Sequence, residues 1–202
     1  MKKSIFGASV IGIIAFSAFT FNADTYKVDT KLSSLEWTGK KIGGEHNGTI
    51  SLSSGSLMVQ NNEVVGGALE VDMKSVKNKD VQDSTWRHKF DEHLMGPDFF
   101  DSEKFPKAKF EITSVTPIKD SKDRNFTHSV KGKLTIKDKT NEITFNAMVK
   151  SQDGKIACVA TVIIDRTKFD IKYGSKIFFS DIGDKMVYDE FTLKFNVVAT
   201  KQ

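Results

Sequence analysis

The stretch FTLKFNVVA, residues 191–199, alternates between apolar and polar side chains. Successive side chains of a β-strand point to opposite faces, so this pattern predicts a strand with one buried and one solvated face. Strands of that kind are typical of antiparallel sheets. The buried face would carry Phe191, Leu193, Phe195, Val197 and Ala199, and the solvated face Thr192, Lys194 and Asn196.

Further segments show the same alternation, and short turn signals separate them. The segments are SLEWTGK (34–40), VVGGALEVDM (64–73), AKFEIT (108–113) and EITFNAMV (142–149). The turn signals are Ser54–Gly55, Asn61–Asn62, residues 137–141 and Asp153–Gly154. Many strands joined by short turns predict an all-β domain, either a sandwich or a closed barrel. Gly66 and Gly67 within a strand favour an internal cavity, because side chains there would otherwise fill space.

The segment DVQDSTWRHKFDEHLMGP, residues 80–97, breaks the strand pattern. Its large apolar residues, Trp86, Phe90 and Leu94, recur at the helical spacing of four. The glycine and proline at its end form a helix stop signal. We therefore predict one inserted helix over residues 81–95, with Asp80 as its N-cap.

The residues that usually carry chemistry form no recognisable set. The histidines lack metal-ligand spacing, no serine lies in Gly-x-Ser-x-Gly, and no glycine-rich loop opens a helix. Cys158 is the only cysteine, which excludes an intrachain disulfide, and its apolar neighbours indicate a buried packing residue. His93, on the apolar helical stripe, is interpreted as a core histidine with a satisfied hydrogen bond, the alternative being a general base. We predict no metal, no cofactor and no catalysis.

Residues 1–23 have the layout of a secretory signal peptide. Two lysines precede an apolar run from Ile5 to Phe21, and the next charged residue is Asp24. The prediction is a signal peptide followed by one domain, residues 24–202, that is soluble and periplasmic or otherwise exported; the alternative is an uncleaved membrane anchor. Removing the two lysines lowers the formal net charge from +4 to +2, so no nucleic-acid partner is predicted.

The order of several motifs resembles that of the YceI-like family of exported, lipocalin-like barrel proteins, also called polyisoprenoid-binding proteins. The matching pieces are WTGKK (37–41), HNGTI (46–50), GGALEVDMKSV (66–76), HLMGPDFFDSEKFPKAKFEI (93–112), VKGKLTIKDKTNEITF (130–145) and IDRTKFDIKYGS (164–175). The resemblance implies an extended antiparallel eight-stranded β-barrel with one inserted helix and a long apolar pore. It also implies a long-chain isoprenoid or fatty amphiphile as the partner held in that pore.

Under this resemblance, strand parity places one set of side chains inside the pore. These are Leu35, Trp37, Leu69, Val71, Phe110, Ile112, Leu134, Ile136, Phe145, Phe191, Leu193 and Phe195. Leu94, Phe99 and Phe100 would cover or line one end. The pore residues are therefore the predicted ligand contacts, and Arg166 and His46 are candidates for meeting a polar head group at the mouth.

Three functional interpretations stay open at this point. The first is an exported carrier without catalysis, with a homodimer as a candidate oligomeric state and with no stable membrane insertion after signal cleavage. The second is an enzyme acting on a lipid or quinone, with His93 or His46 as its base. The third is a filled barrel that serves only as an interaction module.

Overall fold

A computed structural model describes residues 23–119 and 125–202. The predicted signal peptide lies outside these residues, except for its last position, Ala23. Within the described ranges the chain forms nine strands, one α-helix and two short 3-10 helices. The strands are β1 (Asp24–Val28), β2 (Ser34–Lys41), β3 (Gly44–Gln60), β4 (Glu63–Asn78), β5 (Lys107–Pro117), β6 (His128–Ile136), β7 (Lys139–Gln152), β8 (Lys155–Asp165) and β9 (Val187–Lys201). The helices are α1 (Ser84–Met95), η1 (Arg166–Phe169) and η2 (Gly183–Lys185).

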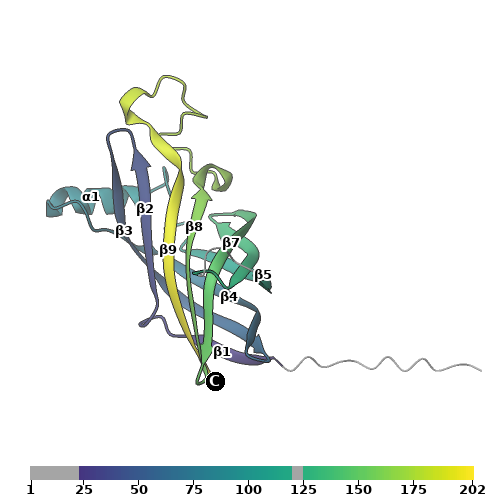
Figure 1. Ribbon diagram of the computed structural model, residues 1–202. Coiled ribbons are helices and arrows are strands. Elements are labelled where there is room, and N and C mark those ends of the chain that lie inside the picture. The colour runs from purple at the N-terminus through teal and green to yellow at the C-terminus, as the bar shows by residue number, and fades with distance from the viewer. Residues whose placement is uncertain (1–22, 120–124) are drawn as a thin grey trace, which may run out of the picture.

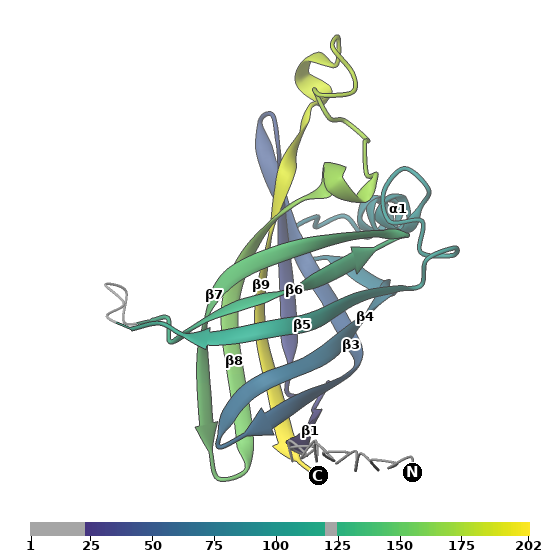
Figure 2. The same ribbon diagram turned by 90° about the vertical axis from the view of Figure 1, so that its right-hand side faces the viewer.

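The strands close into an antiparallel barrel, which Figure 1 and Figure 2 show from two sides. From β2 to β9 each strand pairs with the next in sequence, and β9 pairs back with β2. The short β1 does not add a ninth place to the barrel. It pairs with β3 and β9 beyond the end of β2, in the same place between these two strands. Closure leaves no long unpaired edge among the strands of residues 23–119 and 125–202. The eight-stranded barrel with one inserted helix is therefore confirmed, and the sandwich is wrong.

The turn predicted at Ser54–Gly55 is wrong, because β3 runs straight through it. The pairing of β3 with β4 instead shifts register between Leu52 and Ser54. The bulge reverses the parity of the strand: Ile50 and Leu52 are buried before it, and Leu57 and Val59 after it. A bulge adds one residue to one strand only, which is why simple alternation fails across it.

The helix starts later than predicted, at Ser84, and its N-cap is Asp83 instead of Asp80. The Asp83 carboxylate accepts a hydrogen bond from the Trp86 backbone N–H at 2.8 Å. Asp80 does not cap the helix, since its carboxylate is held by β3 and by the end of β4. The predicted stop at Gly96 is confirmed.

Only the second half of the predicted helical stripe packs against the barrel. Leu94 is buried in the core and Phe90 lies against it, whereas Trp86 is 65% exposed. A buried carboxylate adds to this contact, because Asp91 accepts a hydrogen bond from the Asn78 backbone N–H at 2.6 Å. This bond attaches α1 to the end of β4.

The two strand glycines do not open the cavity, contrary to the prediction. Neither Gly66 nor Gly67 lines it. Gly67 has a φ of +145°, and a Cβ there would collide with the Ser56 carbonyl oxygen and lie 2.9 Å from the Leu57 Cα. Residue 67 must be a glycine because β3 approaches β4 closely at this position.

Candidate ligand-binding cavity

The barrel encloses two adjacent cavities, an inner one of about 100 Å³ and an outer one of about 530 Å³. Five side chains line both of them: Leu35, Val71, Leu134, Ile164 and Leu193. We call these five residues the waist. They come from β2, β4, β6, β8 and β9, so the waist draws on strands all around the barrel.

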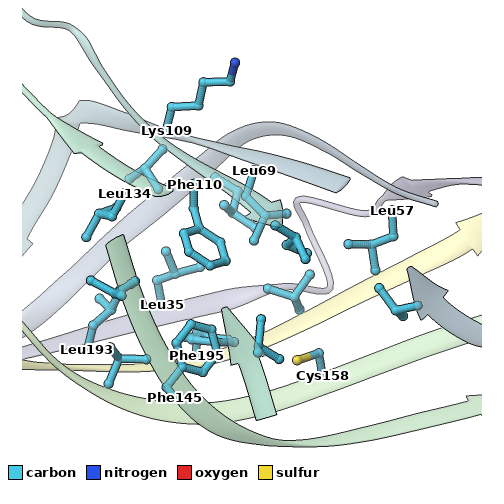
Figure 3. Close-up of a pocket in the computed structure, with 18 of the residues that line it drawn as sticks. Leu35, Leu57, Leu69, Lys109, Phe110, Leu134, Phe145, Cys158, Leu193 and Phe195 are labelled. Atoms are coloured by element: carbon cyan, nitrogen blue, oxygen red, sulfur yellow. The ribbon is translucent and has the colours of Figure 1, made fainter. Parts of the chain in front are cut away.

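The inner cavity is lined almost entirely by apolar side chains. Figure 3 shows leucines and phenylalanines from several strands converging on it, while the Lys109 amine points away. That amine forms an ion pair with Glu111 at 2.9 Å. The rings of Phe110, Phe145 and Phe195 form a row of contacts: Phe110 and Phe145 are tilted with centroids 5.7 Å apart, and Phe145 and Phe195 meet edge to face at 5.6 Å. Such a lining offers dispersion contacts and removal of apolar surface from water, but almost no hydrogen bonds.

Gly132 makes room for one of these rings. A Cβ at this position would collide with the Phe110 ring and with the Glu111 carbonyl oxygen on the neighbouring β5. The glycine in the matching piece VKGKLTIKDKTNEITF therefore lets the Phe110 ring lie against the backbone of β6. A sequence motif is thus explained by the packing of the cavity wall.

The outer cavity has a mixed lining. Trp37, Phe90, Phe99, Phe100 and Phe191 supply aromatic surface. Its polar members are Lys40, Lys41, His46, His93, Arg166, Tyr173, Asp184, Lys185 and Tyr188. Several of these polar residues are exposed, which shows that the outer cavity opens to solvent while the inner one lies deeper.

His93 is not the satisfied core histidine that was predicted. Its Nε2 atom is buried and has no hydrogen-bond partner among the described residues. The imidazole clusters with two aromatic rings: its centroid lies 5.1 Å from that of Phe99 and 4.7 Å from that of Tyr173, and these two rings lie 5.2 Å from each other. Buried polar atoms nearly always have partners. His93 is also one of the residues that line the outer cavity, so an unpaired hydrogen-bonding atom belongs to a side chain of its wall.

His46 belongs to a polar cluster at the end of β4. Its Nδ1 lies 2.7 Å from Asp80 Oδ2, and its ring lies 4.7 Å from that of Phe90 on α1. The Asp80 carboxylate also accepts hydrogen bonds from the Asn47 N–H at 2.8 Å and from the Asn78 amide at 2.6 Å. Burial raises the pKa of Asp80, but these hydrogen bonds outweigh burial and hold it below its ordinary value.

Asp80→Asn is expected to destabilise the protein by about 1–2 kcal/mol at neutral pH, because it removes charge-assisted hydrogen bonds. The lowered pKa means that this contribution is present above the unfolded-state pKa of about 3.9 and is lost as pH falls through the folded-state pKa. The difference in unfolding free energy should therefore shrink as the pH falls below about 3.9. Urea unfolding at several pH values measures it, with exposed Asp98→Asn as the control. A difference independent of pH would contradict this assignment.

The Arg166 guanidinium forms several hydrogen bonds with other groups of the protein. It donates to the carbonyl oxygens of Ile171, Val187 and Tyr188 at 2.8, 3.0 and 3.1 Å, and to the Asp189 carboxylate at 3.2 Å. The side chain is only 4% exposed. Burial lowers the pKa of Arg166, and the nearby Asp189 and Asp165 carboxylates oppose this. Its geometry is that of an anchor between η1 and the start of β9.

Cys158 lines the inner cavity on β8, as a packing residue would. Burial raises the pKa of its thiol to about 12. The thiol is therefore protonated at neutral pH, and a protonated thiol is a poor nucleophile.

All fifteen predicted ligand contacts line one or both cavities, and their contact with a ligand stays a prediction. The inner cavity has Leu69, Phe110, Ile112, Phe145 and Phe195. The outer cavity has Trp37, Leu94, Phe99, Phe100, Ile136 and Phe191. The waist has Leu35, Val71, Leu134 and Leu193.

Sequence reasoning missed much of the β3 and β8 wall. Leu52, Leu57, Val162 and Ile164 all line the cavities. The β3 residues were hidden by the bulge and by the wrong turn at Ser54–Gly55. The β8 residues were hidden because residues 156–164, IACVATVII, form an almost continuous apolar run in which alternation cannot be seen.

Within residues 23–119 and 125–202, no three His, Cys, Asp or Glu side chains come together in a way that could hold a metal ion. The same part of the chain contains no helix with both the length and the apolar character to cross a membrane. The prediction that no metal is bound rests on the sequence and stays a prediction.

The fold and the cavities define the class: a closed antiparallel barrel with an apolar interior that opens to solvent at one end. The chain belongs to the YceI-like domain family, whose sequence profile matches residues 26–199. It is also 30% identical over 152 residues to a UPF0312 protein of Pseudomonas putida strain F1, a match that covers 73% of each chain. The family assigned from sequence motifs is therefore confirmed.

Solved structures show the same fold. Burkholderia cenocepacia BcnA superposes with a TM-score of 0.67 at 24% identity, over 86% of this chain and 99% of its own. A domain from Saccharophagus degradans superposes with a TM-score of 0.60 at 12% identity, over 88% and 98% of the two chains. That domain is described as polyisoprenoid-binding and as implicated in plant cell wall breakdown.

Proposed function

We propose that this protein binds a long-chain isoprenoid or similar amphiphile and carries it, without catalysis. The observation that carries the proposal is the pair of adjacent cavities, with an apolar inner part and a polar-edged opening. Each CH₂ group moved from water into such a lining contributes about 0.8 kcal/mol before the costs of binding. The polyisoprenoid-binding description of the similar Saccharophagus domain supports the same ligand class.

In the proposed complex the chain of the ligand lies in the inner cavity and its head group in the outer one. The apolar row of rings from Phe110, Phe145 and Phe195 suits an unbranched or prenyl tail. His93 Nε2, buried and unpartnered, suits a hydroxyl or carbonyl of the head group. Because the N–H groups of Arg166 donate hydrogen bonds to backbone carbonyl oxygens, we do not assign this residue to the head group.

Mass spectrometry of a solvent extract of the natively purified protein tests this function directly, together with titration of a polyprenol into lipid-free protein. A co-purifying long-chain amphiphile and saturable polyprenol binding are expected. If the extract holds no lipid and no isoprenoid binds, the protein is not a carrier of this class.

His93→Phe is expected to weaken polyprenol binding by about 2- to 10-fold, which corresponds to one hydrogen bond. Binding of a hydrocarbon with the same chain but no hydroxyl should not change, because it has no group to pair with Nε2. His93→Gln keeps a hydrogen-bonding group and serves as the matched variant. Isothermal titration gives all of these constants.

The same variants test the alternative that the protein is an enzyme. The buried and unpartnered His93 is the observation that favours this alternative. An enzyme that uses His93 as its base would lose turnover of a lipid or quinone with both replacements. A carrier would show no turnover to lose. Chromatography of the lipid after long incubation with the protein distinguishes the two cases.

We further propose that residues 1–23 direct export and that the carrier works outside the cytoplasm. The lysine pair and the apolar run to Phe21 support this. The N-terminal residue of protein recovered from a periplasmic extract tests it, with Asp24 expected. Recovery of an intact N-terminus from the cytoplasm alone would contradict it.

A further inference from the structure

The loop between η1 and β9 exposes three consecutive large apolar side chains. Ile177, Phe178 and Phe179 are 72, 44 and 51% exposed. The loop projects beyond α1 at the end of the barrel opposite the C-terminus, as Figure 1 and Figure 2 show. Contiguous exposed apolar groups of this kind mark surfaces that interact with something.

Hydrogen bonds hold the base of this loop in place. The Ser175 carbonyl oxygen accepts from the N–H groups of Phe178 and Phe179, and Gly174 accepts from Val187 at 2.8 Å. The N–H of Ile42, at the tip of the β2–β3 hairpin, donates to Met186 at 3.0 Å. The loop and the hairpin tip are therefore joined. We call residues 40–45 and 172–186 together the rim.

The rim borders the opening of the outer cavity. Lys40, Lys41 and Ile42 from the hairpin line that cavity, as do Asp184 and Lys185 from the loop. All five are also exposed to solvent. A ligand that leaves or reaches the cavity at this end passes the rim.

Cations outnumber acids on the rim. Its lysines are Lys40, Lys41, Lys172, Lys176 and Lys185, and its acids are Glu45, Asp181 and Asp184. The Lys172 amine pairs with the exposed Asp170 carboxylate at 2.7 Å and lies 5.3 Å from the centre of the Phe178 ring, so charge and apolar surface are interleaved. Long lysine side chains can keep their amines at a polar surface while apolar neighbours sink deeper.

We propose that the rim docks onto the surface of a lipid bilayer that carries anionic head groups. Ile177, Phe178 and Phe179 enter the boundary between head groups and acyl chains, and the lysines contact lipid phosphates. The cavity opening then faces the bilayer, so an amphiphile passes between membrane and barrel without crossing bulk water. The transfer of an amphiphile rests on the proposed function. Docking to the bilayer does not, because it can be measured without any ligand.

Flotation of the full chain with vesicles of phosphatidylcholine, with and without phosphatidylglycerol, tests the proposal. The test variant replaces Ile177, Phe178 and Phe179 together with serine. The matched control replaces three exposed apolar residues of the barrel wall, Val65, Val159 and Ile163, with serine. We expect the test variant to lose binding to phosphatidylglycerol vesicles by at least about tenfold, and the control by less than about twofold.

Two further variants sharpen the test. Lys40→Gln with Lys41→Gln should weaken binding to phosphatidylglycerol vesicles and leave binding to pure phosphatidylcholine unchanged. Phe179→Trp keeps an aromatic ring on the loop, and brominated lipids should quench its fluorescence above the background of Trp37 and Trp86. This measurement keeps the apolar surface of the loop, so it tests insertion independently of the serine variant.

Absence of vesicle binding at every composition would overturn the proposal, as would equal losses in the test and control variants. The rim would then serve a protein partner or a second copy of this chain. Polyprenol titration in solution separates the two hypotheses, because the serine variant should bind polyprenol normally. A chain that docks on vesicles but binds no isoprenoid would refute the proposed function and leave this inference standing.

Discussion

Arg166→Met is expected to destabilise the protein by about 3–5 kcal/mol, the usual cost of breaking a buried ion pair by removing one partner. The change leaves the Asp189 carboxylate without its cation and the carbonyl groups of Ile171, Val187 and Tyr188 without donors. These groups hold η1 and the loop after it against the start of β9. Urea-induced unfolding followed by circular dichroism measures the difference.

Lys168→Met is the matched control, since Lys168 lies on the same 3-10 helix and is exposed. It should change the free energy of unfolding by less than about 0.5 kcal/mol. Arg166→Lys keeps the charge but not the planar set of donors, and should recover only part of the loss. A loss below about 1 kcal/mol for Arg166→Met would show that solvent replaces the guanidinium.

Leu134→Trp is expected to weaken the binding of a long-chain polyprenol by about 100-fold or more. Leu134 is a waist residue on β6, and the larger ring would block passage of the chain from the outer to the inner cavity. Keeping as few as four CH₂ groups out of the inner cavity forfeits about 3 kcal/mol, which corresponds to that factor. Titration with prenols of increasing length measures the effect.

The dependence on chain length is the decisive feature of this prediction. A short prenol that fits the outer cavity should bind both proteins alike, and the affinities should diverge only for longer chains. Leu134→Met conserves volume and should change little. Lys133→Trp places the same ring at the next position, which is exposed on the outer face of β6, and controls for the ring itself. Equal affinities at every length would show that the chain does not reach the inner cavity.

The two predictions distinguish stability from binding within one barrel. Arg166 is expected to affect unfolding because all its described polar contacts are made within the protein. Leu134 is expected to affect binding because it lines space on both sides of the waist. Measuring both quantities for both variants therefore tests the division between anchoring and ligand-contacting residues.

Strand alternation in the sequence was sufficient to predict an all-β domain and many of its inward-facing residues, whereas the choice of a barrel over a sandwich came from the family resemblance. In segments such as residues 108–112 and 191–195, each inward residue is two positions from the next, and this spacing is a local property of the chain. The order of the motifs identified the family because each motif can be recognised in a short stretch of sequence. Glycines such as Gly132 stand in these motifs because neighbouring strands approach closely there. Local patterns of this kind are visible without knowing the fold.

Only the tertiary structure decided the features that depend on distant segments. The bulge in β3 reversed the parity between Leu52 and Leu57, and no local signal marked it. Asp80 pairs with His46 across the sheet instead of capping the helix, and Arg166 reaches carbonyl groups of a loop that follows it. His93 Nε2 has no partner among the described residues, and the contacts of its ring are with the rings of Phe99 and Tyr173, which come from separate loops. Side-chain parity is set by the backbone of one strand, whereas hydrogen-bond partners and cavities arise only where separate strands and loops meet.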